Sequence, residues 1–280
     1  MAKQPVSKVS NGSDTTERLL KRVTVSIAIL ATVYLLLAYF VLPAMWTHHE
    51  RQPGLADRPM LTTTRQGIPG DPINVGLVGD REDIVRAMHE AGWFAANDVT
   101  WRSSVKIIGS VLLDRPYQTA PVSPLIYEGR SEDLAYEMPD GVSANRRHHV
   151  RLWRVLDAGL EGRPIWLGAS TYDRGVGFSR YTEQVTHYIA PQIDQERDFL
   201  IGQLRAAGMV ETQYSVTGVG PTLIGRNGEG DLYQTDGEVW VAQLVVKGNR
   251  RTERPLILDP PKIVQEKNTI WNALMGVVEQ

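Results

Sequence analysis

The chain has 280 residues, with 30 Lys and Arg against 32 Asp and Glu, and the charges are mixed along it rather than gathered in one basic stretch. This balance argues against a nucleic-acid partner. The complete lack of cysteine excludes a disulfide framework, a thiolate zinc site, an iron–sulfur cluster and a cysteine nucleophile. A hydrophobic fraction of 42%, with 7 Trp and 10 Tyr, is typical of a folded chain of one large or two small domains.

The N-terminal part has the composition of a tail followed by a membrane span. Residues 1–22 are polar and rich in Ser, Thr, Asn and Lys, which predicts a short disordered tail. Residues 23–42 contain no charged side chain, and at ~1.5 Å per residue they cover about 30 Å, the thickness of a bilayer's hydrocarbon core. We therefore predict a transmembrane helix over residues 23–44. The alternatives are a buried helix of a soluble protein and a cleaved signal peptide, whose apolar run is only ~7–15 residues long.

Basic residues lie mainly on one side of this run. Only Arg51 follows it within a dozen residues, whereas five basic residues precede it: Lys3, Lys8, Arg18, Lys21 and Arg22. By the positive-inside rule the N-terminus is cytoplasmic. We therefore expect a signal-anchored, single-pass membrane protein, with the lipid bilayer as a partner and the C-terminal domain across the membrane from the N-terminus. In a Gram-negative bacterium the anchor would lie in the inner (plasma) membrane and the domain in the periplasm.

A linker and a folded domain follow the span. Residues 45–72 are rich in Pro and Gly, the composition of an extended linker. The domain is predicted over residues 73–250. It opens with a short apolar run that suits a buried strand, and a helix then begins at Asp80 and ends at Gly92. A second helix is predicted from Asp98, because apolar residues recur there at spacings of three and four.

From about residue 125 the pattern changes to an alternation rich in β-branched and aromatic residues, which indicates strands. A helix over residues 193–207 interrupts them, introduced by Pro191 and closed by Gly208. Helices and strands do not alternate as in a doubly wound sheet, so we predict an α+β fold, with packed helices on a mostly antiparallel sheet, preceded by one transmembrane helix. The predicted strands are 125–130, 132–138, 148–156, 163–172, 184–189, 210–217 and 238–246.

Residues 251–280 form a C-terminal extension, in which 262–279 have the pattern of an amphipathic helix. Four apolar residues share one face of it: Ile263, Ile270, Leu274 and Val277. Such a helix packs on its own domain, or it binds a membrane surface or a protein partner. Its polar face lacks the many basic residues that are typical of membrane-surface helices.

The segment 148–153 carries the most suggestive side chains. On a strand, His149, Arg151 and Trp153 share one face, while His148 lies at the margin of the core face. An Arg that clamps an anion, a His that donates a proton and a Trp that forms a wall would suit a phosphate or carboxylate ligand. The alternative is an exposed strand with amphipathic side chains.

Other candidate residues lie on either side of that strand. Asp173 precedes a glycine-rich stretch where an acid could act as a base, and His187 offers a third imidazole. With His149 they would make a two-His, one-carboxylate metal set if they converged, but nothing in their spacing requires it, and no metal site is predicted. Arg115 and Tyr117 lie on a proline-rich loop that either lines a ligand site or only connects two parts of the domain.

Several motifs of known chemistry are absent or misleading. The sequence contains no G-x-S-x-G elbow, no Walker A loop and no HExxH. Residues 227–238 superficially match the ligand spacing of a calcium-binding EF-hand loop, but Leu232 stands where that loop needs glycine. A hairpin with an Asn-Gly turn is the better interpretation.

Four segments, taken in order, resemble the LssY C-terminal domain family: residues 114–130, 146–153, 164–178 and 186–200. The resemblance covers residues 105–215. It implies a bacterial domain that is often attached to membrane proteins, some of which carry a lipid-phosphate phosphatase-type module. The motifs of that module are absent here, so the resemblance implies no reaction and no catalytic residues.

The sequence therefore predicts a membrane-anchored protein of the cell envelope, whose extracytoplasmic domain is a binding or accessory module. The alternative is a hydrolase for a phosphorylated or glycosidic envelope compound, with His149, Arg151, Asp173 and His187 as catalytic residues and Arg115, Tyr117, His148 and Trp153 as ligand-binding residues. A third hypothesis is a structural partner in a secretion or envelope assembly that uses the C-terminal helix. The residues point to no particular cofactor.

Overall fold

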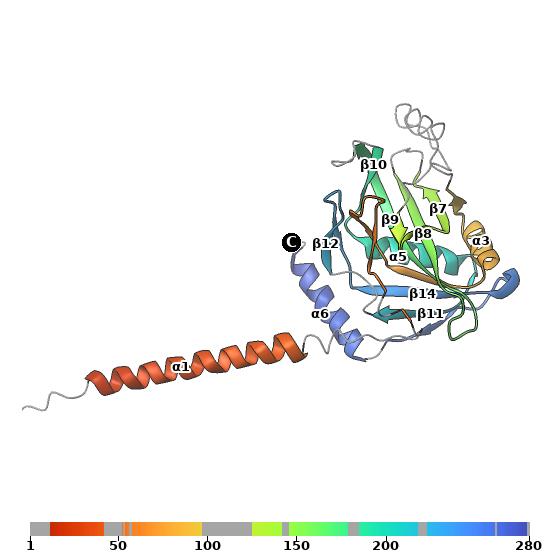
Figure 1. Ribbon diagram of the computed structural model, residues 1–280. Helices are drawn as coiled ribbons and strands as arrows, with labels where there is room; N and C mark the ends of the chain where they lie inside the picture. The colour runs from red at the N-terminus through yellow and green to blue at the C-terminus, as the bar shows by residue number, and fades with distance from the viewer. Residues whose placement is uncertain are drawn as a thin grey trace, which may run out of the picture. The chain divides into compact units, whose positions relative to one another are not determined.

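The computed structural model places helices and strands in two units of the chain, Met1–Thr47 and His48–Gln280 (Figure 1). Each unit is described by itself. The residues described are 12–41, 52, 54–55, 58–96, 125–141, 146–178, 185–217, 223–260 and 262–278. The helix predicted from Asp98 and the loop with Arg115 and Tyr117 lie outside these residues.

The first unit is one long helix. α1 (Gly12–Leu36) continues into a π-helical turn, η1 (Leu37–Val41). Thr16–Val41 is long and apolar enough to cross a membrane, and its large apolar side chains are exposed. Because a bilayer is the solvent that favours such a surface, the helix fits a membrane anchor, as the uncharged run at residues 23–42 predicts.

The second unit is built on a nine-stranded sheet. Its strands follow the order β15-β11-β14-β3-β9-β8-β7-β4, and β10 pairs with β9. All neighbours are antiparallel except β11 with β15 and β14 with β3, so the predicted α+β fold with a mostly antiparallel sheet is confirmed. The strands are β3 (Val75–Val78), β4 (Phe94–Ala95), β7 (Leu134–Pro139), β8 (Arg147–Leu156), β9 (Ile165–Phe178), β10 (Val185–Ile189), β11 (Val210–Thr217), β14 (Glu238–Leu244) and β15 (Leu256–Leu258).

Two helices pack on one face of this sheet. They are α3 (Arg81–Glu90) and α5 (Ile193–Ala206), and α5 runs behind β8 and β9 in Figure 1. Alternate side chains of β8, such as Val150 and Leu152, join Met88 of α3 and Leu200 of α5 in one buried cluster. This is the core face expected from the alternation in β8.

A small second sheet packs on the other face of the large sheet, opposite to α3 and α5. Its strands follow the order β2-β1-β5-β6 and are β1 (Leu61–Thr63), β2 (Pro69–Pro72), β5 (Ile126–Tyr127) and β6 (Arg130–Ser131). A second buried cluster contains Leu55 and Tyr127 together with Trp153 and Leu167 of the large sheet.

The expectation of an extended linker over residues 45–72 differs from the structure at its C-terminal end. Residues 61–63 and 69–72 are strands, and Thr62 and Asp71 are buried. Two of the prolines that suggest a linker, Pro69 and Pro72, stand in β2, the edge strand of its sheet, where a residue without an N–H is tolerated.

The remaining elements are a hairpin and the C-terminal helix. β12 (Ile224–Arg226) and β13 (Leu232–Gln234) pair antiparallel around a turn in which the Asn227 side chain accepts the Asp231 N–H at 2.9 Å. The stretch is thus a hairpin and not a helix-flanked calcium loop, as predicted. α6 (Lys262–Val278) matches the predicted amphipathic helix, and a short 3-10 turn, Val246–Gly248, precedes β15.

Candidate functional site

A cluster of buried charged side chains lies on the face of β8 and β9 opposite to α5. Side chains alternate between the two faces of a strand, so Arg147, His149 and Arg151 of β8 share this face with Thr171 and Asp173 of β9. The register places Arg147 opposite Asp173 and His149 opposite Thr171. All five side chains are buried. We call this group the buried charge cluster; it also includes Asp71, Glu137 and His187.

His149 lies at the centre of the cluster. Its Nδ1 lies 3.1 Å from Asp173 Oδ1 in an ion pair, and its Nε2 lies 2.6 Å from Thr171 Oγ1. Burial by itself lowers the pKa of His149, but the charge of Asp173 outweighs it, and the pKa is raised above its usual value. Arg151 Nη1 also lies 3.0 Å from the same Nε2, and because a guanidinium can only donate, this ring nitrogen faces a donor, while Nδ1 faces the Asp173 carboxylate and carries a proton.

Arg147 links three other members. Its Nη1 donates to Glu137 Oε2 at 2.7 Å, and its Nε donates to Asp173 Oδ2 at 3.0 Å. Its Nη2 lies 3.2 Å from His187 Nε2. Since a guanidinium can only donate, this ring nitrogen accepts, which requires neutral His187. Burial agrees with this assignment, because it lowers the pKa of His187 to about 4.

Arg151 joins the two sheets. Its Nη1 donates to Asp71 Oδ2 at 2.9 Å, and Asp71 belongs to β2 of the small sheet. Burial alone would raise the pKa of Asp71, but the contacts with His149 and Arg151 lower it, so the carboxylate is charged. Both arginines of the cluster are thus already paired with carboxylates.

Glu137 differs from the other two carboxylates of the cluster, Asp71 and Asp173, because its pKa is raised rather than lowered. Burial raises its pKa to about 8, in spite of Arg147 beside it. Its Oε1 and the Nε of Arg151 are buried without a hydrogen-bond partner among the described residues. The cluster therefore contains one acceptor and one donor that form no hydrogen bond, and the raised pKa lets Glu137 hold a proton at neutral pH.

His148 points to the other face of β8. Its Nδ1 lies 2.8 Å from Glu196 Oε2 of α5, and its ring stacks on Phe199 with 4.1 Å between ring centroids. It is therefore separated by the sheet from His149. Trp153 is fully buried in the second core cluster, with its ring centroid 5.6 Å from that of Tyr127. This position leaves Trp153 no exposed surface with which to line a ligand site.

The structure thus brings together four residues that sequence analysis singled out, His149, Arg151, Asp173 and His187. It places His148 on the other face of the sheet and buries Trp153 in an apolar cluster. Sequence analysis gave no role to Asp71, Glu137 or Thr171. Asp71 falls in a stretch with a linker's composition, and only the pairing of strands shows that it is buried. The signal that could have found Thr171 and Glu137 is the alternation along β9 and β7, which places a polar side chain on a covered face.

No group of three or more metal-ligating side chains that could hold an ion is found among the described residues. His149, His187 and Asp173 come close, with the rings 3.1 and 4.0 Å from the Asp173 carboxylate. The Arg147 guanidinium, however, contacts both Asp173 and His187. A cationic side chain therefore occupies the position between them that a metal ion would need.

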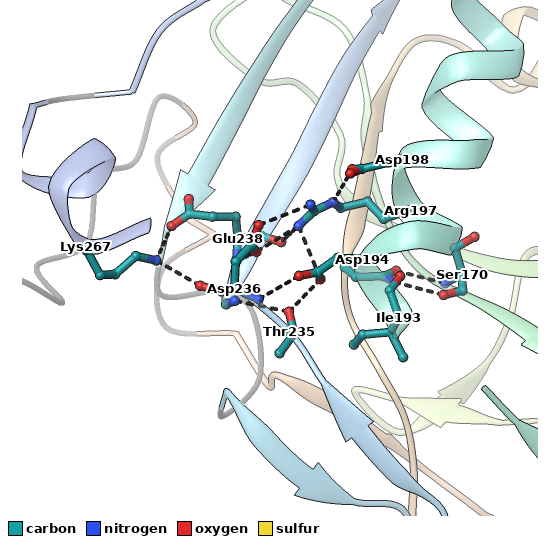
Figure 2. A network of polar contacts seen from close by, with 11 residues as sticks. Ser170, Ile193, Asp194, Arg197, Asp198, Thr235, Asp236, Glu238 and Lys267 are labelled. Carbon is teal, nitrogen blue, oxygen red and sulfur yellow. Dashed lines mark hydrogen bonds and ion pairs between the residues drawn. The ribbon is translucent and has the colours of Figure 1, made fainter. Parts of the chain in front are cut away.

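A second polar network fastens α6 to the domain (Figure 2). Arg197 of α5 donates to both carboxylate oxygens of Asp236, at 2.8 and 3.1 Å. Lys267 of α6 pairs with Glu238 at 2.5 Å and donates to the Asp236 carbonyl at 2.9 Å. Lys267 and Glu238 are both buried. This network joins the start of α5, the start of β14 and α6, and it contains none of the predicted site residues.

The fold and the buried charge cluster define an α+β domain, in a chain whose described residues include one helix long and apolar enough to cross a membrane. Residues 55–239 match the family model described as LssY C-terminus. The chain therefore belongs to this family, and the resemblance over residues 105–215 is confirmed and extended to residues 55–239. No curated protein and no solved structure matches the chain.

Proposed function

We propose that the chain is a single-pass protein of the bacterial inner membrane, whose LssY C-terminal domain lies in the periplasm and acts as a binding or accessory module of the cell envelope. The apolar helix Thr16–Val41 supports membrane anchorage. The excess of Lys and Arg before the span supports a cytoplasmic N-terminus, because positive residues are retained on the cytoplasmic side.

The observation that favours a module over an enzyme is that both buried arginines are already paired with carboxylates. A hydrolase for an anionic compound would use a guanidinium to hold the anion. Arg151 is instead paired with Asp71, and Arg147 with Glu137 and Asp173. All of these groups are buried, so an anion would have to displace a carboxylate from a covered site. The cluster is therefore best explained as the polar core of the domain.

Topology can be tested with single cysteines, because the chain has none of its own. Ser7→Cys and Thr252→Cys are compared in the full chain, and cells with a permeabilised outer membrane are treated with a membrane-impermeant maleimide. We expect labelling at position 252 before lysis and at position 7 only after it. Labelling of position 7 in unlysed cells would reverse the proposed orientation.

A second candidate function is hydrolysis of a phosphorylated or glycosidic envelope compound. It is favoured by the convergence of His149, Asp173 and His187, of which His187 is neutral and partly exposed. In this function Arg151 would bind the substrate anion.

The two functions are separated by an assay of the purified full chain with p-nitrophenyl phosphate and p-nitrophenyl glycosides, with and without divalent metal ions. The module predicts no turnover above the background. The hydrolase predicts turnover that is lost in His187→Gln and retained in His89→Gln, which changes an exposed histidine of α3. Such a result would replace the module by the hydrolase.

A further inference from the structure

Large exposed apolar side chains follow one edge of the domain. Leu256 and Ile257 of β15, the terminal strand of the large sheet, are 60% and 47% exposed. α6 follows directly in the chain and is held by its buried residues Val264 and Lys267. Three apolar residues of α6 are exposed, although they lie at helical spacing from the buried Lys267 and so flank the contact of the helix with its domain: Ile263, Ile270 and Leu274. We call β15 and α6 together the β15 edge.

The chain that comes from the anchor helix enters the domain next to this edge. Gln52 is fully buried, and its Nε2 donates to Tyr214 Oη of β11 at 2.7 Å. β11 is the direct neighbour of β15, with Tyr214 opposite Leu258. The Oε1 of Gln52 accepts the N–H of Leu160, whose side chain is another exposed apolar group. The first fixed point of the domain is thus one strand away from the β15 edge.

The length of the connection limits how far this edge can lie from the bilayer. Val41 ends the membrane-spanning helix and Gln52 is already part of the domain. Eleven peptide units extend at most roughly 40 Å. β4 lies at the opposite edge of the same sheet, seven strand spacings or about 34 Å from β15. The tether is therefore long enough for the β15 edge to reach the bilayer.

The charge of the same segment suits an anionic surface. Residues 247–262 contain five basic and two acidic residues, Lys247, Arg250, Arg251, Arg254 and Lys262 against Glu253 and Asp259. Arg250 pairs with Glu90, and Arg251 pairs with Glu253 at 3.4 Å, but both arginines are exposed. Basic residues directly beside exposed leucine and isoleucine are typical of segments that bind the interface of anionic membranes.

From these observations we propose that the β15 edge rests on the anionic lipid surface of the membrane in which α1 is inserted. The proposal depends on the membrane anchor of the proposed function, but not on the side of the membrane on which the domain lies or on its being a module. A domain in this position would present its β4 edge and the hairpin β12–β13 to the surroundings, and the lipid would cover the apolar side chains of β15 and α6.

The absence of native cysteine allows a direct test. Leu256→Cys and Ile270→Cys are each labelled with the fluorophore NBD in the full chain, which is reconstituted in nanodiscs of phosphatidylcholine with 30% phosphatidylglycerol. The matched control is Phe94→Cys, an exposed apolar residue on β4 at the opposite edge. Lipids with a nitroxide on the headgroup then quench labels close to the bilayer.

We expect quenching at positions 256 and 270 to be at least about twofold stronger than at position 94, since β4 lies some 34 Å away. Replacement of the phosphatidylglycerol by phosphatidylcholine is expected to reduce this difference. Equal quenching at the three positions would overturn the proposal. So would blue-shifted, unquenched labels at 256 and 270, which would show that a second copy of the chain covers the edge. A chain that fails to enter nanodiscs would overturn the anchor itself, a result distinct from both.

Discussion

At the scale of single residues, the buried charge cluster is held by mutual pairing. Asp173 is the clearest case, because it contacts both Arg147 and His149 and is fully buried. Burial alone would raise the pKa of Asp173, but contact with His149 above all, and the charge of Arg147 as well, hold it well below its usual range. A carboxylate in this position stabilises the fold only while its partners stay charged.

Asp173→Asn is expected to lower the free energy of unfolding by about 3–5 kcal/mol, because it leaves buried cations without their counter-charge. The matched control is Asp157→Asn, which breaks the Arg154 pair at 3.0 Å with a fully exposed carboxylate and should cost less than about 1 kcal/mol. Urea titration of the full chain in detergent measures both. A cost for Asp173→Asn no greater than that of the control would mean that the cluster does not stabilise the domain.

Glu137 makes stability depend on pH. Its pKa is about 8 in the folded chain, above the usual 4.5, because of burial. Between these values the folded state holds a proton that the unfolded state has lost, so stability falls as pH rises. The raised pKa of His149 acts in the same direction above pH 6.5, whereas the lowered pKa of His187 opposes it only between about 4 and 6.5.

We therefore expect the free energy of unfolding to fall by about 2 kcal/mol from Glu137 alone between pH 6.5 and 8. Glu137→Gln should remove this part of the slope and leave the part due to His149. Urea titrations at several pH values in this window measure the effect. An unchanged slope in the variant would show that Glu137 is already ionised at neutral pH, in its pair with Arg147.

At the scale of elements, the close packing of neighbouring strands requires glycine at particular positions. Gly168 lies in β9 between β3 and β8. A Cβ atom there would lie 2.7 Å from Leu152 Cδ2 and 2.9 Å from the Arg151 carbonyl oxygen. The backbone oxygen cannot move without disturbing the ladder between β8 and β9, so this position admits only glycine.

Gly168→Ala is expected to lower the free energy of unfolding by about 1–3 kcal/mol through overpacking. Gly175→Ala in the same strand is the control, since nothing lies within 4 Å of a Cβ at that position. Thermal unfolding followed by circular dichroism compares the two. Similar melting temperatures for both variants would contradict the close approach of β3, β8 and β9 at Gly168.

The docking of α6 depends on the Lys267–Glu238 pair. Lys267→Ala is expected to cost about 3–5 kcal/mol in the docking of this helix, because Glu238 then remains buried and unpaired. Faster hydrogen exchange at Val264, which is buried in the wild type, is the measurement. The double variant Lys267→Met with Glu238→Gln should recover protection, since the uncompensated charge is gone. Unchanged exchange in Lys267→Ala would show that apolar contacts alone hold α6.

At the scale of the whole molecule, the chain joins two units that differ in the polarity of their surfaces. The anchor helix has exposed apolar side chains, whereas the LssY C-terminal domain encloses two apolar clusters and a charged one. Each unit therefore suits a different solvent. The family match over residues 55–239 covers only the second unit, whereas the helix that is long and apolar enough to cross a membrane lies in the first.

Ile29→Arg places a charge in the middle of the anchor helix, where it costs about 2.5–3.5 kcal/mol for insertion. We expect part of the variant to appear in the supernatant after carbonate extraction of membranes, while the wild type stays in the pellet. Ile29→Leu is the control and should stay in the pellet with the wild type. A fully retained Ile29→Arg chain would indicate that the LssY C-terminal domain binds the membrane by itself, through a surface such as the β15 edge.

Local patterns in the sequence were enough for much of the architecture. The uncharged run predicted the anchor, and periodicity predicted α5 and most strands of the large sheet within one or two residues. The alternation in β8 also predicted that His149 and Arg151 share a face. These features depend on side chains within one turn or one strand, so they are visible without knowledge of the fold.

Only the tertiary structure decided what surrounds those side chains. Asp71 is 80 residues from Arg151 and pairs with it because two sheets pack together. Glu137 and Asp173 reach Arg147 through strand pairing, which turns an expected anion clamp into a compensated, buried cluster. The sequence by itself determined the elements and their faces, because these follow from local periodicity. The burial and pairing of the charged groups were decided by contacts between distant strands, because burial is a property of the packed chain.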